Sequence, residues 1–416
     1  MIYYFVTNYI RSFIINIIFI HRNYPAQFRY IIPKLTADKN NRVVFITNNT
    51  NTPAQDGVIK IEYKLRRSVP EDCHRYLRFY EESIIHGQAV AGELLGLKNQ
   101  GFVPDLIIGH SWGNSMFVKE VYPDTPYISY VEWYYNYENS DVDFASKDLE
   151  INQKAELVCK NSHILQDLVK SDLVITATEW QKQQIPEIFR NKVKVLHEGI
   201  NTEYFKPDDN AEFKIPDSDI ILTKKDKVLT YATRGMEEYR GFPEFMAAAS
   251  ELMKKEPDLH VVIAGEDRVC YGRKLVNTTF KKEMLKKYEY DMSRLHFVGA
   301  LPYPEYLNLL RISTAHIYLT YPFILSWSML EAMATECVII ASNTPPVKEY
   351  MQNGYNGVLV DFYNIEEIVN SVSDILNNRE KYTEISKNAR KTIIEKCEQK
   401  DMIEKQLELI NSAVKG

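Results

Sequence analysis

Two arginines in one short segment have the chemistry to bind phosphate. The segment YATRGMEEYRGF covers residues 231–242, with Arg234 directly after an apolar run and Arg240 six positions later. A helix is expected to begin just after them, and the free N–H groups of a helix N-terminus attract anions. Arginine keeps its charge and binds phosphate oxygens in pairs. The pattern indicates a diphosphate site, but surface ion pairs with Glu237 and Glu238 would explain the two arginines equally well.

A second segment, YPFILSWSMLEAMA at 321–334, places one carboxylate, Glu331, inside an apolar run. A strand is expected to end near Tyr321 and a helix to begin at Ser326 or Ser328, so Glu331 should lie in the first turn of that helix. A carboxylate there can accept hydrogen bonds from a ribose diol, as acidic residues do in nucleotide sites. Taken alone, a capping box from Ser328 to Glu331 is the stronger interpretation.

The segments around these residues predict the elements that position them. Short runs rich in β-branched residues recur, and several are continuously apolar, which is typical of strands buried on both faces of a parallel sheet. Helical patterns lie between them, for example over 243–256 and 366–378. Strands that alternate with helices predict a doubly wound α/β fold. The expected strands lie at 14–20, 43–47, 58–63, 106–111, 127–133, 173–178 and 193–199, and again at 228–233, 260–265, 295–301, 315–321, 338–342 and 357–362.

The series of strands restarts after a polar segment, residues 205–227, which is expected to be a linker. We therefore predict two Rossmann-like domains, 1–205 and 206–395, that face each other across a cleft. The last helix, over 383–415, is expected to return so that residues 396–416 pack on the first domain. Ligands of open α/β sheets bind beyond the carboxyl ends of the strands, so the chemistry should lie in loops directly after strands.

Loops of the first domain also follow predicted strands and carry residues suited to a sugar acceptor. His110, in LIIGHSWGN, is one candidate, although a lone histidine after a strand often has only a structural role. Carboxylates hold hydroxyl groups and aromatic faces stack on sugars, but the segment EWYYNYENSDVDF at 132–144 is equally consistent with a core aromatic cluster. The acceptor-side candidates are His21, Asn23, Tyr24 and Gln27 in HRNYPAQF, and Glu132 and Trp133.

The composition argues against several classes of protein. Of the 416 residues, 45% are hydrophobic and 25% charged, which is typical of a globular chain. A net charge of −6 argues against a broad nucleic-acid-binding surface. The five cysteines lie far apart without a C-x-x-C pair, so we expect no disulfide framework, no structural zinc, and a reducing, cytoplasmic location. No acidic pair is placed to hold a metal against a diphosphate, so we expect neither metal nor cofactor.

Two segments bear on contact with a membrane. Polar residues interrupt the opening MIYYFVTNYIRSFIINIIFI and no small-residue cleavage site follows, so we expect neither a signal peptide nor a spanning helix. Residues 1–13 form an extension of unknown use that has the composition to touch a membrane. The segment 64–79, KLRRSVPEDCHRYLRF, is locally basic and suited to phosphate or anionic lipid, although such a run is more often a solvated face. Peripheral contact with the inner face of a membrane therefore stays open.

The order and spacing of the motifs resemble the retaining family-four (group 1) glycosyltransferases of GT-B architecture, in a bacterial branch. The likeness covers the second half of the chain and, more weakly, the first, where IHRNYPAQFRYIIPKL at 20–35 carries it. The motifs of the second half are R-x5-R-G at 234–241, IAGED at 263–267, FVGALPYPEYLNLL at 297–310, LEAMA at 330–334 and ASNTPPVKEYMQNGYNGVLV at 341–360, preceded by HEGINTEYFKP at 197–207.

The resemblance implies roles for particular residues. Arg234 and Arg240 would hold the donor diphosphate, and Glu331 would bind the ribose hydroxyls. The backbone around Val298 and Gly299 would contact the base. The family counterpart of His110 lies close to the donor sugar. The catalytic candidates are thus Arg234, Arg240, Glu331 and His110, and the further donor-side candidates are Gly265, Val298, Gly299, Phe323, Leu325 and Ser326.

The chain departs from the family pattern at two points. Where the family commonly has a second glutamate that contacts the donor sugar, eight residues before Glu331, this chain has Phe323. The two arginines also lie one residue further apart than in the commonest pattern.

The resemblance implies retaining transfer from a nucleotide-diphosphate sugar, first of all a UDP-sugar, to a glycan, lipid-linked or protein acceptor, as in polysaccharide biosynthesis. Phe323 leaves open a catalytically impaired nucleotide-sugar-binding protein. A non-hydrolysing UDP-sugar epimerase shares the architecture, and a phosphorylase would need a cofactor lysine to which no motif points.

Overall fold

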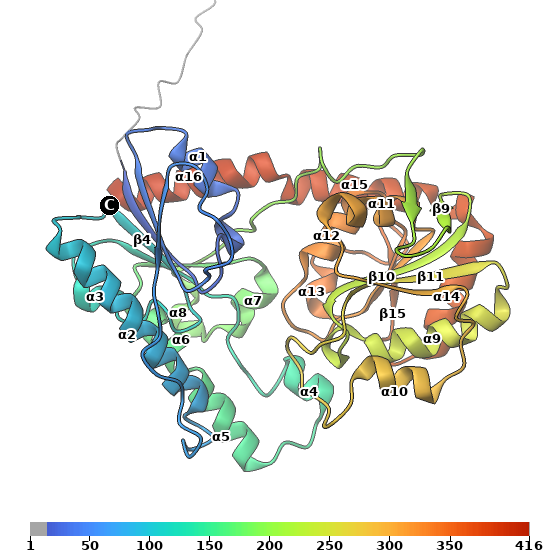
Figure 1. Ribbon diagram of the computed structural model, residues 1–416, viewed down its shortest axis with the longest axis horizontal. Coiled ribbons are helices and arrows are strands. Elements are labelled where there is room, and N and C mark those ends of the chain that lie inside the picture. The colour runs from blue at the N-terminus through green and yellow to red at the C-terminus, as the bar shows by residue number, and fades with distance from the viewer. Residues whose placement is uncertain (1–14, 416) are drawn as a thin grey trace, which may run out of the picture.

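The computed structural model describes residues 15–415, which form two α/β domains, each built on a parallel sheet (Figure 1). The first sheet has seven strands in the order β3-β2-β1-β4-β5-β6-β7, and the second has six in the order β12-β11-β10-β13-β14-β15. The strand order reverses between β1 and β4 and between β10 and β13, so each sheet has a crevice at the carboxyl ends of those strands. The predicted fold class, two doubly wound α/β domains, is confirmed. The strands are β1 (Asn16–Ile20), β2 (Arg42–Thr47), β3 (Val58–Glu62), β4 (Leu106–His110), β5 (Tyr127–Tyr130), β6 (Leu173–Thr176) and β7 (Val193–Val195), then β10 (Lys227–Gly235), β11 (Leu259–Glu266), β12 (Leu295–Gly299), β13 (Ala315–Tyr318), β14 (Ile339–Ser342) and β15 (Val358–Val360).

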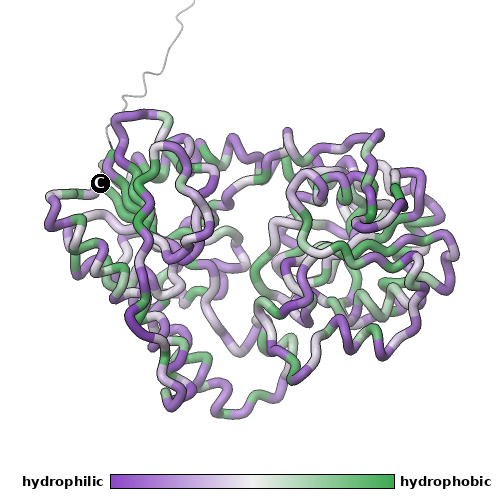
Figure 2. The backbone as a smooth tube through the Cα atoms, viewed as in Figure 1, coloured by the Kyte–Doolittle hydropathy of each residue, from purple (hydrophilic) through white to green (hydrophobic). Residues whose placement is uncertain are grey.

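The central strands are apolar along their whole length because both faces of each sheet are buried. In β1, Ile17 and Phe19 belong to one hydrophobic cluster, whereas Ile18 and Ile20 belong to another on the opposite face. Successive side chains of a strand point to opposite faces, so a strand between two helical layers needs apolar residues at every position. Figure 2 shows this as hydrophobic colour along the central strands of both domains.

Helices cover both faces of each sheet. One face of the second sheet packs on α9 and α14, and the other on α11, α12 and α15. In the first domain, α1 and α16 cover one face, and α2 and α3 the other. The helices are α1 (Ile31–Thr36), α2 (Arg78–Asn99), α3 (Val118–Val121), α4 (Asp141–Ala145), α5 (Ile151–Lys160), α6 (Ser162–Lys170), α7 (Glu179–Gln184), α8 (Glu187–Arg190), α9 (Phe242–Lys255), α10 (Phe280–Lys287), α11 (Tyr303–Ile312), α12 (Trp327–Ala334), α13 (Pro345–Lys348), α14 (Ile365–Asn377), α15 (Thr383–Cys397) and α16 (Gln399–Lys415).

The polar segment predicted to be a linker, residues 205–227, contains a small antiparallel hairpin. Its strands are β8 (Glu212–Lys214) and β9 (Ile221–Thr223). Phe213 and Leu222 pair across the hairpin and are both buried in a cluster of the second domain. One apolar residue in each three-residue strand anchors the hairpin. A single apolar residue among polar neighbours is too short a pattern to predict a strand.

The C-terminal helix predicted over 383–415 is two helices. Glu398 breaks it with a non-helical backbone, φ −54° and ψ 127°. There the chain pairs with Ile200, whose N–H donates to the Cys397 carbonyl (2.8 Å) and whose carbonyl accepts from the Gln399 N–H (3.0 Å). Helix α16 then lies on the first domain, where Ile403 and Ile410 join the cluster around Phe19 (Figure 1).

Within residues 15–415, no helix is long and apolar enough to cross a membrane. The predicted N-terminal extension, residues 1–13, lies outside the described residues. The basic segment at 64–79 has exposed arginine side chains, those of Arg66, Arg67, Arg75 and Arg78.

Candidate active site

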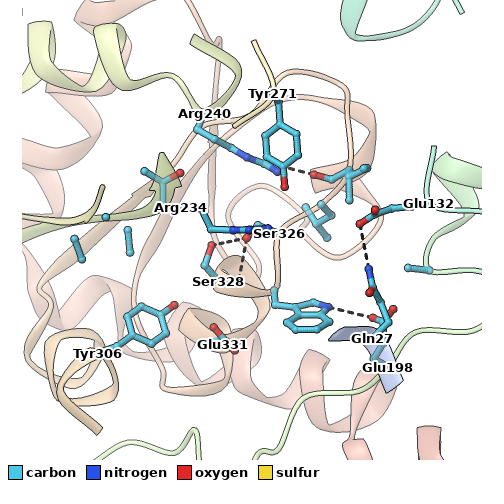
Figure 3. Close-up of a pocket in the computed structure, with 18 of the residues that line it drawn as sticks. Gln27, Glu132, Glu198, Arg234, Arg240, Tyr271, Tyr306, Ser326, Ser328 and Glu331 are labelled. Atoms are coloured by element: carbon cyan, nitrogen blue, oxygen red, sulfur yellow. Dashed lines mark hydrogen bonds between the residues drawn. The ribbon is translucent and has the colours of Figure 1, made fainter. Parts of the chain in front are cut away.

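A cavity of about 460 Å³ lies between the two domains, at the carboxyl ends of the strands of both sheets (Figure 3). Both crevices therefore open into one space, as expected for facing α/β domains. The first domain lines it with residues that follow β1, β5, β6 and β7, and the second with residues from the ends of β10, β11 and β12 and the loop before α12. The polar lining residues are Gln27, Arg29, Tyr130, Glu132, Thr178, Gln181, His197, Glu198, Thr233, Arg234, Arg240, Glu266, Arg268, Tyr271, Tyr303, Tyr306, Ser326, Ser328 and Glu331.

Both predicted phosphate-binding arginines reach this cavity. The Arg240 guanidinium is buried, and its NH1 group donates to Thr320 Oγ1 (2.8 Å), the Ile324 carbonyl (3.1 Å) and the Tyr318 hydroxyl (3.2 Å). Its Cζ lies 5.2 Å from the centroid of the Tyr271 ring. The NH1 group is thus held by the protein, whereas Nε and NH2 form no hydrogen bond with residues 15–415 and can bind an anion.

The alternative interpretation, surface ion pairs with Glu237 and Glu238, is wrong. Neither arginine forms an ion pair with a carboxylate of residues 15–415, and Glu237 is fully buried. Its Oε2 accepts three backbone hydrogen bonds, from Cys270 (3.0 Å), Tyr271 (2.8 Å) and Gly272 (3.0 Å). Glu237 therefore fixes the loop that carries Tyr271 over Arg240.

Glu331 lies in the second turn of α12, not in the first as predicted. Ser326 caps this helix by accepting from the Ser328 N–H (3.3 Å), so the capping box from Ser328 to Glu331 is not formed. The Glu331 side chain is buried and lines the cavity beside Tyr306 (Figure 3). Burial raises the pKa of Glu331 to about 7, while the Tyr306 hydroxyl and the Arg29 charge lower it. This carboxylate faces the cavity and does not stabilise the helix end.

The other donor-side candidates are divided between the cavity wall and the layer behind it. Gly265, Leu325 and Ser326 line the cavity. At Gly265 the backbone has φ +133°, and an added Cβ would lie 2.0 Å from the Thr233 carbonyl oxygen, so only glycine fits there. Val298 and Gly299 do not line the cavity, whereas Ala300 and Leu301, directly after them, do.

Phe323 is buried behind the wall, in a cluster of aromatic rings. Its ring centroid lies 4.8 Å from that of Trp133, 5.2 Å from Tyr271 and 5.4 Å from Tyr239. Trp133 belongs to the first domain, so Phe323 and Trp133 join the two domains by an apolar contact beside the cavity.

On the first-domain side, Gln27 and Glu132 line the cavity and are joined by a hydrogen bond from Gln27 Nε2 to Glu132 Oε1 (3.3 Å). His110 lies behind Glu132, with its Nε2 3.5 Å from Glu132 Oε2, and its ring is 4.4 Å from that of His21. Burial lowers the pKa of both histidines, to about 3 for His110, so both are neutral. Asn23 is exposed and Tyr24 packs on Phe45, and neither lines the cavity.

Two residues of the site have no role in the sequence analysis. Glu198, in HEGINTEYFKP, is buried and accepts hydrogen bonds from the Tyr130 hydroxyl and, across the cleft, from Trp327 Nε1 (3.0 Å). Arg29 lies over the Trp327 ring (4.1 Å from Cζ to centroid) and donates to the Tyr303 hydroxyl (3.0 Å). Each of them has a partner in the second domain, so only the motif around Glu198 signals them in the sequence. No cluster of three or more His, Cys, Asp or Glu side chains in residues 15–415 is arranged to hold a metal ion.

Known structures share this two-domain arrangement. The sucrose-phosphate synthase of Thermosynechococcus elongatus superposes with a TM-score of 0.69 at 14% identity, over 95% of this chain and 98% of that one. The Anabaena protein HepE, in complex with UDP-glucose, gives a TM-score of 0.68 at 12% identity, over 96% and 100% of the two chains. At these identities the likeness shows a common fold, the GT-B fold.

Sequence comparisons place both halves of the chain in one family. Residues 39–205 match the model of the "Glycosyl transferase family 4 group", and residues 215–392 match that of the "Glycosyl transferases group 1". An uncharacterized glycosyltransferase of Methanocaldococcus jannaschii is 26% identical over 227 residues. That match spans 53% of this chain and 54% of the relative, so the chain covers about half of the relative's length. The two family models together match most of the chain, which therefore belongs to the group 1 glycosyltransferases of family four.

Proposed function

We propose that this protein transfers a sugar from a nucleotide-diphosphate sugar to an acceptor hydroxyl, with retention of the anomeric configuration. The observation that carries the proposal is one interdomain cavity with Arg234, Arg240 and the α12 N-terminus on one side of Glu331. The arginines and the helix N-terminus favour a diphosphate, and the buried Glu331 carboxylate favours a diol such as ribose.

The proposed reaction needs little covalent chemistry from the protein. The bond between the anomeric carbon and the phosphate oxygen breaks, and the acceptor oxygen bonds to the same face of that carbon. The departing phosphate oxygen takes the acceptor proton. Three acceptors hold the Arg240 guanidinium in place before the reaction. The group therefore does not need to move as negative charge develops on the phosphate. These fixed charges do the work of a metal ion, and we propose a reaction without metal or cofactor.

UDP is the nucleotide that the proposal names first. The HepE structure holds UDP-glucose in a protein of the same fold. Tyr303 and Tyr306 line the cavity near Glu331, where their rings offer apolar surface to a base. The acceptor is a glycan, lipid-linked or protein hydroxyl. We also propose a cytoplasmic location, with the exposed arginines of residues 64–79 as the segment for an anionic acceptor or membrane lipid.

A second candidate function, nucleotide-sugar binding without transfer, is favoured by the aromatic ring of Phe323 beside the cavity. An epimerase of the same architecture would convert the donor without an acceptor. These alternatives differ in their products, so one set of assays separates them.

The test is a panel of UDP, GDP and ADP and their sugar conjugates, measured by thermal shift and then by hydrolysis and transfer. A ligand at about 100 times its dissociation constant adds about 2.7 kcal/mol to the free energy of unfolding. We expect a shift with the uridine compounds, slow hydrolysis of one UDP-sugar and release of the α-configured sugar from an α-linked donor. Binding without turnover, with acceptors supplied, would favour the binding protein. Epimerised donor would favour the epimerase, and no shift with any nucleotide would refute the proposal.

A further inference from the structure

Four carboxylates line the cavity within the described residues, those of Glu132, Glu198, Glu266 and Glu331. Three of them face a partner. Glu266 pairs with Arg268 (2.7 Å), Glu198 accepts from Tyr130 and Trp327, and Glu331 lies beside the Tyr306 hydroxyl. Glu132 differs, because its Oε2 is buried and accepts no hydrogen bond from residues 15–415. A buried carboxylate oxygen without a donor is costly unless a ligand supplies one.

The groups around Glu132 do not satisfy this oxygen. His110 Nε2 lies 3.5 Å from Glu132 Oε2, but the two atoms form no hydrogen bond with each other. Burial raises the pKa of Glu132, and the charges of Arg234 and Arg240 across the cavity offset part of that rise, yet neither arginine forms an ion pair with the Glu132 carboxyl. The carboxylate therefore faces the two arginines from the opposite wall, with cavity space between them (Figure 3).

That space is where a sugar attached to the bound diphosphate would lie. If the arginines hold the phosphates, the sugar on the outer phosphate extends away from the nucleotide end near Glu331 and Tyr306. Glu132 lies at the far side of the arginines from these two residues in Figure 3. Sugar hydroxyls are hydrogen-bond donors, and a carboxylate oxygen accepts two such bonds.

The second domain offers the sugar few acceptors at this point. The Ile324 carbonyl already accepts from Arg240, and the apolar ring of Phe323 lies behind the cavity wall. Phe323 packs on Trp133, the residue next to Glu132 in the chain. The apolar side chain of one domain and the unpartnered carboxylate of the other are thus adjacent, at the same end of the cavity.

We propose that Glu132 binds the hydroxyl groups of the donor sugar, and that the first domain supplies the sugar-binding carboxylate that residue 323 does not. The inference rests on the proposed function, because it requires a nucleotide-sugar donor in the cavity. The ligand class is a hexose with free hydroxyl groups, linked to a nucleoside diphosphate. The role differs from the acceptor contact expected from the sequence.

The test compares Glu132→Gln with Glu138→Gln, a change of an exposed carboxylate in the same loop. Isothermal titration measures the affinity of each protein for UDP and for UDP-glucose, or for whichever UDP-sugar the wild type hydrolyses. We expect Glu132→Gln to bind UDP as the wild type does and to lose about tenfold or more in affinity for the UDP-sugar. Glu138→Gln should match the wild type with both ligands.

Three results would overturn the inference while the wild type still binds UDP. Glu132→Gln could keep full affinity for the UDP-sugar, could weaken UDP and the UDP-sugar equally, or could raise only the KM for the acceptor. The first leaves Glu132 without a binding role, the second assigns it to the nucleotide, and the third to the acceptor. If the wild type binds no nucleotide, the proposed function itself fails, and the inference fails with it. Urea titration of both variants identifies any loss that comes from unfolding.

Discussion

The buried glutamate between the two arginines gives the sharpest structural prediction. Glu237 Oε2 accepts three backbone N–H groups, at 2.8 to 3.0 Å, from consecutive residues of the loop after β11. These three bonds tie the loop to Glu237. The loop carries Tyr271, whose ring lies over the Arg240 guanidinium. The change to test is Glu237→Gln, which keeps the shape of the side chain and removes its charge.

The expected cost follows from the three bonds. Hydrogen bonds to a charged group stabilise by about 1.5–3 kcal/mol each, and neutral ones by about 0.5–1.5 kcal/mol. Changing three hydrogen bonds from charged to neutral should therefore lower the free energy of unfolding by about 3 kcal/mol. Glu237 Oε1 is buried without a partner, so the new amide NH₂ group would also find no acceptor there. The relief of burying a charge offsets part of this cost.

The measurement is urea unfolding of Glu237→Gln beside Glu238→Gln, a change at the exposed neighbouring residue. We expect Glu237→Gln to lose about 3 kcal/mol of unfolding free energy, or to release the loop locally with about tenfold weaker UDP binding, because Tyr271 no longer supports Arg240. Glu238→Gln should change neither. If Glu237→Gln unfolds and binds UDP as the wild type does, the reasoning that Glu237 fixes this loop is refuted.

Three further predictions concern the cavity. Arg240→Ala should lower the transfer rate by about 100-fold or more. The chain should stay folded, because Thr320 and Tyr318 keep other hydrogen bonds. Turnover and urea midpoints check this, and unchanged turnover would contradict the phosphate-binding role of Arg240. Burial raises the pKa of Glu132 to about 7, because the folded protein favours the protonated carboxyl. The stabilisation that protonated Glu132 contributes is complete below the unfolded-state pKa of this group, and it is lost as the pH rises through about 7. Glu132→Gln does not titrate, so it should gain stability relative to the wild type between about pH 5 and pH 8, by up to about 3 kcal/mol, and a pH-independent difference in urea midpoints would count against a buried, ionisable Glu132. Gly265→Ala should lower the free energy of unfolding by about 1–3 kcal/mol and weaken UDP binding, because the added Cβ meets the Thr233 carbonyl. Gly96→Ala, which has open space around it, should change neither the urea midpoint nor UDP binding, and equal behaviour of the two variants would contradict the strain at Gly265.

The sequence predicted the sheets because the strands are apolar at consecutive positions. Runs such as VVFIT and HVVIAG place alternate residues in cores on opposite faces, and no surface strand has that pattern. The hairpin of Phe213 and Leu222 carries one buried residue in each strand and gives no such signal. The break at Glu398 depends on pairing with Ile200, nearly 200 residues earlier, so no local pattern reveals it.

Site residues at the end of a strand or in the segment that follows it were predictable for the same topological reason. Arg234, Arg240, Gly265 and Glu331 all reach the cavity because the carboxyl ends of parallel strands meet at one edge. Contacts between domains were not predictable in this way. The bonds of Glu198 and Arg29 to the second domain, and the position of His110 behind Glu132, depend on how the two domains dock.

The most direct test of the central claim compares UDP with uridine. The proposed phosphate site gives UDP its affinity, so the wild type should bind UDP about 100-fold or more tightly than uridine in isothermal titration. Arg240→Ala should lose most of that difference and still bind uridine as the wild type does. If the wild type binds UDP no more tightly than uridine, the arginines and the α12 N-terminus do not form a diphosphate site, and the account of this cavity is wrong.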